Sequence, residues 1–369
     1  MRIGIPLLAG CAAAAMIVAA SERSTVQAPG IAFNPERYVC LRAKTPLRID
    51  GVLDEEAWAK APWTKAFVDI EGDLKPRPRF ATRVKMLWDD GFFYVGAELE
   101  EPHVWATLTK RDSVVFYDND FEVFIDPDGD THNYNELELN ALNTVWDLFL
   151  VKPYRDGGPA LHAWDIQGLK SAVAVQGTLN DARDKDQGWT VEIAFPFEVL
   201  KETLPGKKLP AAGDVWRVNF SRVEYRVETG GGAYKKAADS KTGKPLPEDN
   251  WVWSPQGLVN IHLPEMWGYV LLSGESEGGA AGEFLASGDE QAKRALRKIY
   301  YWEWAYHNER GVFAGDLKSL GLADDPELKA AGADSRIAIR ITESLFEASL
   351  PAPGGAKRHI RQDGLVWKD

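Results

Sequence analysis

The chain of 369 residues is poor in cysteine and methionine and has no excess of positive charge. It contains 43 lysines and arginines against 55 aspartates and glutamates, which gives a formal net charge of -12. A nucleic-acid partner is therefore excluded, because phosphate binding needs clustered basic side chains. Only two cysteines are present, and one of them, Cys11, lies in the apolar N-terminal stretch, so no disulfide is expected.

Common catalytic motifs are also missing. The sequence has no HExxH zinc motif and no glycine-rich phosphate loop. A glycoside hydrolase would need two carboxylates on either side of the scissile bond. Glu136 and Glu138 are the nearest candidates, but they alternate along one strand and would lie on the same side of a sugar. The sequence thus favours a protein without catalytic activity.

The N-terminus has the layout of a secretory signal peptide. Arg2 precedes an apolar stretch from Ile3 to Ala20, and polar residues follow. We expect residues 1–28 to be removed by cleavage after Ala28, which predicts an exported protein that is periplasmic, secreted or at the cell surface. The alternative is a lipoprotein, because the residues before Cys11 read Leu-Ala-Gly, and a lipid on Cys11 would then be the one contact with a membrane.

Residues 34–273 read as many short strands separated by turns. Asp89-Asp90-Gly91 between two of these runs is typical of a hairpin. Few helical stretches interrupt the strands, so we predict an all-β fold, an antiparallel β-sandwich of the immunoglobulin-like or jelly-roll type. The expected strands are 80–87, 92–99, 121–125, 134–140, 145–151, 173–179, 189–195, 215–223 and 269–272.

The pattern changes after the sandwich. Residues 274–288 are rich in Gly, Ala, Ser and Glu, which predicts a flexible linker. Residues 289–369 begin with apolar side chains at helical spacing, from Ala292 to Tyr306, and continue with strand-like pieces at 337–341, 345–350 and 359–367. We expect a small C-terminal α+β unit of unassigned role.

Polar side chains alternate with leucines in the strand 134–140. Glu136, Glu138 and Asn140 therefore share one face, with successive side chains about 6.6 Å apart, close to the length of one pyranose ring. This spacing suits hydrogen bonds to several sugar hydroxyls, although a solvated strand face has the same pattern. The 14 tryptophans include several in turn-rich segments, where flat rings suit sugar stacking as well as core packing.

An acidic loop follows the strand 121–125. Asp126, Asp128 and Asp130 place three carboxylates close together, as a calcium loop would. Leu137 stands where an EF-hand has its bidentate glutamate, so this loop is not an EF-hand. Asp-Pro-Asp-Gly is also an ordinary turn sequence, and the calcium and turn interpretations both remain open.

Four ordered blocks resemble family 9 carbohydrate-binding modules. They are Ile49-Asp-Gly-Val-Leu-Asp-Glu-Glu-Ala-Trp58, Val84-Lys-Met-Leu-Trp-Asp-Asp90 with Phe93-Tyr-Val95, Asp120-Phe-Glu-Val-Phe-Ile-Asp126, and Gly188-Trp-Thr-Val-Glu-Ile-Ala194. The resemblance covers about residues 42–272. It implies a β-sandwich with structural calcium, in which two tryptophan rings hold a sugar beside a polar strand.

The resemblance also implies the residues of a glycan site. Glu122, Glu136, Glu138 and Asn140 fall on the polar wall of the family site. Phe116 and Tyr117 stand near the first aromatic platform, and His262 stands near the second. The chain departs from the family where Glu138 replaces an expected arginine and where the two tryptophan platforms are absent. A structural or surface-assembly protein with a degenerate sugar site is therefore the main alternative to a glycan-binding protein, ahead of a hydrolase.

Overall fold

The computed structural model describes residues 25–279, 288–330, 337–351 and 355–369. Most of the expected signal peptide, including Cys11, lies outside these residues, as do residues 280–287 of the expected linker. Among the described residues, no helix combines the length and the apolar character needed to cross a membrane.

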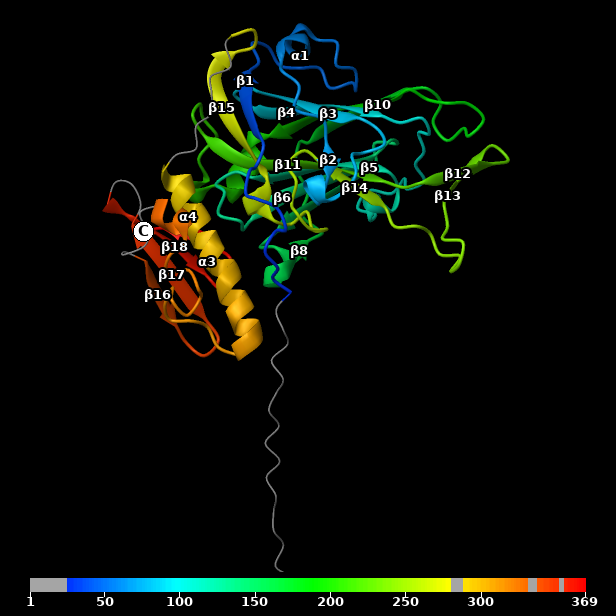
Figure 1. The fold of residues 1–369 in the computed structure, drawn as a ribbon. Coiled ribbons are helices and arrows are strands. Elements are labelled where there is room, and N and C mark those ends of the chain that lie inside the picture. The colour runs from blue at the N-terminus through cyan, green and yellow to red at the C-terminus, as the bar shows by residue number, and fades with distance from the viewer. Residues whose placement is uncertain (1–24, 280–287, 331–336, 352–354) are drawn as a thin grey trace, which may run out of the picture.

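Residues 37–276 carry one large sheet of 13 strands that folds into two layers (Figure 1). The first layer runs in the order β9 (Lys170–Gln176), β10 (Gly188–Pro196), β4 (Phe92–Glu100) and β3 (Thr82–Trp88). The second runs in the order β8 (Ala160–Leu161), β7 (Val145–Leu150), β6 (Tyr134–Asn140), β5 (Asp120–Asp126), β11 (Val215–Glu224) and β15 (Gly268–Ser276). β14 (Asp249–Val252) pairs with β11 and with β2 (Val68–Asp69).

The strand β1 (Arg37–Arg42) joins the two layers. Residues Arg37 to Arg42 pair with β15, with a register shift between Cys40 and Arg42, and Leu41 and Arg42 also pair with β3. Both pairings are parallel, whereas the other pairings of the large sheet are antiparallel. The predicted all-β sandwich is confirmed, but the sheet is mixed rather than purely antiparallel.

The main core lies between the two layers. Alternate residues of β5 and β6, such as Val123 and Leu137, point into it and meet Val95 and Ile193 of β4 and β10. Trp216 of β11 is fully buried there. Alternation of apolar side chains therefore identified these strands in the sequence. The predicted strand bounds agree with the structure within three residues, except that β15 continues four residues beyond its expected end at Leu272.

Two of the sequence blocks meet in space. The carboxylate of Glu192 in β10 accepts hydrogen bonds from Trp58 Nε1 (2.7 Å) and from the backbone amides of Asp50 (2.9 Å) and Gly51 (2.8 Å). Gly51 has a φ of 88°, and a Cβ there would come within 2.7 Å of the β9 backbone. These block residues therefore fasten the N-terminal segment to the first layer and have a structural role.

Short helices and one hairpin complete the sandwich. The helices are α1 (Glu56–Lys60), α2 (Phe197–Leu200), η1 (Gly72–Leu74), η2 (Val115–Tyr117), η3 (Tyr154–Asp156), η4 (Lys201–Thr203), η5 (Pro205–Lys207) and η6 (Pro264–Met266). The hairpin β12 (Val227–Gly230) and β13 (Ala233–Lys236) extends away from the layers (Figure 1). Of these, η2, η3 and η6 matter most below, because they border the polar face of β6.

The C-terminal unit consists of one long helix on a four-stranded sheet (Figure 1). α3 (Gly288–Arg310) packs its buried side, including Leu296 and Ile299, against β17 (Phe346–Pro351) and β18 (Lys357–Arg361). α4 (Pro326–Ala330), β16 (Ala338–Ile341) and β19 (Val366–Lys368) complete the unit. The segment 359–367, expected as one strand, instead forms β18, a turn and β19.

The expected linker is shorter than residues 274–288. β15 continues through Ser276, and α3 already begins at Gly288, so both ends of that segment belong to regular elements.

α3 contacts the sandwich through two neighbouring tyrosines. Tyr300 Oη donates to Asp156 Oδ1 (2.5 Å), while Tyr301 Oη accepts from Arg155 Nη1 (3.0 Å) and donates to Glu265. Arg155 Nη2 also donates to Glu265 Oε2 (3.0 Å). The C-terminal unit is thus held to η3 and η6 by a buried, charged network.

Candidate functional site

Four carboxyl groups gather on the face of β5 and β6 that points away from the main core. Glu122 lies directly opposite Glu138, and Glu136 lies opposite Phe124. Asp120 is next to Glu122 on the same face of β5, opposite Asn140. The strand alternation therefore brings the predicted polar residues together, as the sequence suggested.

This polar face is covered instead of being displayed to solvent. Glu122, Glu136 and Glu138 are only 6%, 4% and 2% exposed. Tyr134, Trp146 and Trp267 belong to a buried cluster on this side of the second layer, and Phe116 packs against it. The expectation of an open polar wall is thus wrong in this respect, because aromatic side chains from segments distant in sequence cover it.

Burial raises the pKa of all four carboxyl groups, because the charged form loses its hydration. The pKa of Glu122 rises to about 7, and that of Glu136 rises to about 8, with the charge of Glu122 adding to burial. For Asp120 and Glu138, burial and then the charge of Glu122 hold the pKa well above its usual range. At neutral pH the group therefore retains protons, so that it offers hydrogen-bond donors as well as acceptors.

Asn140, predicted as a sugar contact, is fully engaged by the protein. Its Nδ2 donates to the carbonyl of Leu108 (2.9 Å) and to Asp118 Oδ2 (3.0 Å). Its Oδ1 accepts from the amides of Leu142 and Thr144, both at 3.0 Å. An amide side chain has two donor hydrogens and two acceptor lone pairs, so no group of Asn140 remains for a ligand. Its role in this structure is to hold the loops beside β6.

One aromatic wall of the site comes from η2. The ring of Phe116 lies 5.0 Å from that of Tyr117 and 6.3 Å from that of Trp146. The amide of Phe116 donates to Glu138 Oε2 (3.2 Å), which brings this wall against the carboxyl groups. Tyr117 is 59% exposed and is the outermost ring of the wall.

The opposite wall contains His262 and a residue that the sequence reasoning missed. The ring of Tyr154 lies edge-on to His262, with 4.6 Å between ring centroids, and Tyr154 is 49% exposed. Burial raises the pKa of Tyr154 to about 12, and the charges of Glu136 and Glu138 contribute. The sequence feature that could have identified Tyr154 is its position as an aromatic residue in the turn-rich segment Pro153 to Gly158.

His262 is a neutral part of this wall. Burial, assisted by the nearby charge of Arg155, lowers the pKa of His262 to about 3. Its Nδ1 lies 2.9 Å from the hydroxyl of Tyr134, and its ring packs edge-on against Phe124. His162, also missed, stacks on Trp146 with 5.7 Å between centroids and extends the first wall.

Within the residues that the structure describes, three acidic groups have the spacing of metal ligands. The first is part of the candidate site itself, since oxygens of Asp120, Glu122 and Glu138 lie within 4.8 Å of one another. Asp120 Oδ2 and Glu136 Oε2 are buried and have no hydrogen-bond partner within the described residues. Oxygen ligands of this kind suit calcium as well as sugar hydroxyls.

The predicted calcium loop forms the second group. Asp126, Asp128 and Asp130 have oxygens within 4.8 Å of one another. Both oxygens of Asp126 accept from backbone amides, of Gly129 at 2.9 Å and of Thr131 at 3.0 Å. The ammonium of Lys293 from α3 donates to the carbonyls of Asp128 and Gly129, at 3.0 and 3.2 Å. Calcium at this loop stays a prediction, since in this structure a lysine supplies the positive charge.

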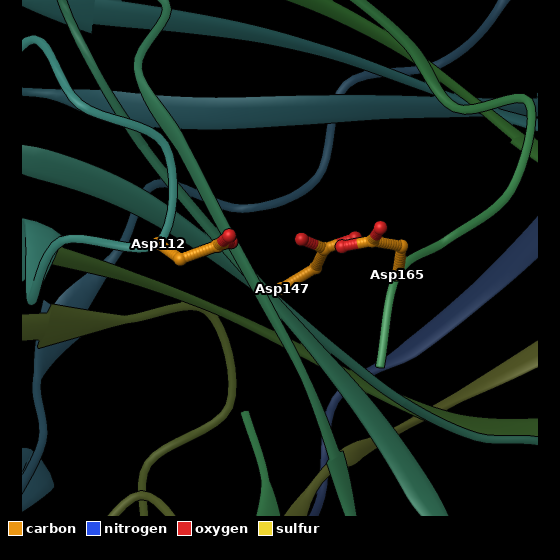
Figure 2. A group of neighbouring side chains, drawn as sticks. All are labelled: Asp112, Asp147 and Asp165. Carbon is orange, nitrogen blue, oxygen red and sulfur yellow. The ribbon is translucent and has the colours of Figure 1, made fainter. Parts of the chain in front are cut away.

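The third group consists of Asp112, Asp147 and Asp165, whose carboxyl groups point toward one another (Figure 2). Arg111 pairs with all three, at 2.5 Å from Asp147, 3.2 Å from Asp165 and 3.7 Å from Asp112. The guanidinium offsets part of the negative charge of this cluster and joins its three carboxylates in an ion-pair network beside β7.

Comparison with known proteins gives a family match for part of the chain. Residues 49–216 match the model of the family described as carbohydrate family 9 binding domain-like. The match includes all four carboxyl groups of the site and both rings of η2, whereas His262 and the C-terminal unit lie beyond it. No curated protein matches the chain.

Two similar solved structures are carbohydrate-binding modules of family 9 from Caldicellulosiruptor kristjanssonii. The one in complex with cellotriose is 17% identical, with a TM-score of 0.42, and the match covers 68% of this chain and 100% of that one. The one in complex with glucose is 18% identical, also with a TM-score of 0.42, and the match covers 66% and 98%.

Proposed function

Since residues 49–216 match the model of the carbohydrate family 9 binding domain-like family, we propose that the protein binds a glycan at the face of β5 and β6 without catalysing its cleavage. The observation that supports this most is the group of carboxyls, Glu122, Glu136 and Glu138, lying between two aromatic walls. Exposed Tyr117 stands on one wall and exposed Tyr154 on the other.

The two kinds of side chain have separate tasks in this proposal. Tyr117 and Tyr154 cover the apolar faces of a sugar ring and remove them from water. The carboxyl groups beneath them hydrogen bond to the hydroxyls, either as charged acceptors or as protonated donors. Because these carboxyl groups are close to fully buried, a bound sugar hydroxyl must match their positions. The carboxyl groups thus select which pattern of hydroxyls is bound.

The arrangement of the carboxyl groups argues against hydrolysis. Glycoside cleavage needs an acid and a second carboxylate on opposite sides of the scissile bond. Glu122 and Glu138 are a cross-strand pair, and Glu136 is on the same face of the same strand as Glu138. All of them approach a ligand from one side, which suits recognition and not the two-sided chemistry of a hydrolase.

One observation favours a second candidate function. The strong burial of the carboxyl groups is also what a sandwich with a degenerate sugar site would show. In that case the protein serves assembly or surface structure, with the C-terminal unit available for contacts. The two candidates differ in one measurable property, because only the first predicts saturable glycan binding.

The test is a glycan array of plant, algal and bacterial glycans that includes cellotriose, followed by calorimetry on each hit. We expect Tyr117→Ala and Tyr154→Ala each to weaken binding by about 1 kcal/mol, the usual contribution of an aromatic contact. Trp302→Ala is the matched control, since Trp302 is an exposed aromatic residue of α3 outside the site. A blank array together with self-association in sedimentation would favour the structural role.

Export and a part in polysaccharide breakdown remain predictions from residues 1–28 and from the family resemblance. Secretion of a tagged full-length chain, with N-terminal sequencing of the product, tests both the cleavage after Ala28 and the lipid anchor at Cys11.

A further inference from the structure

A cavity of about 310 Å³ lies between the sandwich and the C-terminal unit, away from the proposed glycan site. Its walls come from the N-terminal segment 28–33, from β11 and β15, and from one side of α3. Figure 1 shows α3 running beside the sheet at this junction. The cavity has the size of a site for a small organic molecule.

Five basic and three acidic side chains line this cavity, so positive charge prevails. The three carboxylates have cationic partners: Glu265 pairs with Arg155, Glu290 with Lys293, and Glu327 with Arg294 and Lys298. The remaining cations are Arg217 and Arg297, for which the described part of the chain supplies no carboxylate within ion-pair distance.

These two arginines are buried, and their hydrogen bonds go to uncharged groups. Arg217 is 5% exposed and donates to the carbonyls of Pro264 and Glu265. Arg297 is 6% exposed and donates to Thr131 Oγ1 (3.0 Å) and to the carbonyl of Gly364 (2.6 Å). Nη1 of each has no partner among the described residues. Glu290 acts on Arg217, and Asp156 and Glu265 act on Arg297, only from beyond ion-pair distance. An anion beside the two guanidinium groups would give them a direct charged partner and satisfy the unpaired Nη1 atoms.

The rest of the wall is apolar and aromatic. Phe33 lies under the guanidinium of Arg294, at 4.4 Å from ring centroid to Cζ, and Tyr269 lies under that of Arg217, at 3.8 Å. Ile31, Met266 and Trp302 also face the cavity. A fully hydrated inorganic anion would leave these surfaces uncovered, whereas an organic anion with an apolar body would bury them.

We propose that this cavity binds a small organic anion with one carboxylate on an apolar body. The carboxylate lies beside Arg217 and Arg297, where bidentate contact with a guanidinium is available, and the body lies against Phe33 and Tyr269. The cavity is distinct from the glycan face but shares Glu265 and Tyr301 with the network that holds η3, and it gives the junction with the C-terminal unit a ligand-binding role.

Calorimetry on the full chain with sodium benzoate, at constant ionic strength, tests the proposal. Benzyl alcohol has the same ring without the charge, and sodium acetate and inorganic phosphate have the charge without the ring. We expect benzoate to bind with at least about tenfold higher affinity than any of the three, because a charge-assisted hydrogen bond and apolar burial both contribute.

Two variants locate the site. Arg297→Gln is expected to weaken benzoate binding about tenfold through loss of a charged donor, and Phe33→Ala is expected to weaken it through loss of the apolar wall. Arg310→Gln, an exposed arginine at the end of the same helix, should leave binding unchanged. Phe33→Ala keeps the test informative if Arg297→Gln fails to fold.

Equal binding of benzoate and benzyl alcohol would overturn the role of the arginines. Binding of phosphate alone would overturn the organic ligand, and no binding of any probe, or wild-type affinity in both variants, would overturn the site.

Discussion

At the scale of single residues, the carboxyl groups of β5 and β6 determine how the protein responds to pH. Their pKa values are raised by burial, to about 7 for Glu122 and to about 8 for Glu136, above the values of these groups in an unfolded chain. The folded state therefore holds more protons than the unfolded state at neutral pH. These protonated carboxyl groups contribute their full stabilisation at acid pH, below their pKa values in the unfolded chain. The contribution is lost as pH rises through their pKa values in the folded protein.

We expect the free energy of unfolding to fall between pH 5 and pH 8 and the substitution Glu136→Gln to reduce this fall. At pH 8 the variant should be more stable than the wild type by about 2 kcal/mol, since one pKa unit corresponds to about 1.4 kcal/mol. Urea unfolding at several pH values measures both effects. Glu98→Gln is the control, because Glu98 forms an exposed ion pair with Arg83. An unchanged pH profile of stability for Glu136→Gln would contradict the raised pKa of Glu136 as its cause.

Asn140 gives a second prediction at this scale. Asn140→Ala leaves the backbone amides of Leu142 and Thr144 without their side-chain acceptor and removes two donors from Leu108 O and Asp118 Oδ2, in a buried position. We expect a loss of about 2–4 kcal/mol in the free energy of unfolding, because unsatisfied buried polar groups are costly. Thermal unfolding measures it, with Asn260→Ala, in a half-buried loop, as the comparison. A wild-type melting temperature would show that these bonds contribute little.

At the scale of elements, α3 supports the wall of the proposed glycan site that contains Tyr154 and His262. Its Tyr300 and Tyr301 contact Asp156 and Glu265, which belong to the short helices η3 and η6. Those helices also carry Tyr154 and follow His262. The C-terminal unit is therefore coupled to the site through the buried ion pair of Arg155 and Glu265.

Tyr301→Phe tests this coupling. The substitution removes the hydroxyl that accepts from Arg155 and donates to Glu265, so we expect a loss of about 1–3 kcal/mol in stability. Hydrogen exchange should rise in segments 154–156 and 264–266, where the network ends. Tyr306→Phe, on the same helix but outside the network, should change neither quantity. Equal exchange in both variants would mean that α3 does not hold these segments.

At the scale of the whole molecule, the sequence predicted the strands well and the site less well. β6 begins and ends where the alternation of leucine and polar residues predicts, since one face packs on a core. The parallel pairing of β1 with β15 was beyond such patterns, because it joins residues far apart in the chain. The burial of Glu122, Glu136 and Glu138 could not be predicted from the sequence pattern either. The side chains that bury them come from η2 and from Trp267, which are distant from β5 and β6 in sequence.

The domain boundary shows the same limit. Composition alone marked residues 274–288 as a linker, but hydrogen bonding extends β15 to Ser276. Tyr154 was overlooked because a single aromatic residue in a turn has no periodic pattern to mark it. Local sequence therefore predicted the elements, while the contacts between elements decided which polar groups became part of a buried site.

The position of β1 has a consequence for biosynthesis. Arg37 to Cys40 lie between the two layers only when Tyr269 to Leu272 are present to pair with them. During translation the first strand of the sandwich is therefore made long before its neighbour β15, and the intervening chain must close a very long loop. The nascent sandwich stays unfinished, with an unpaired edge on β1, until nearly three quarters of the chain has been synthesised.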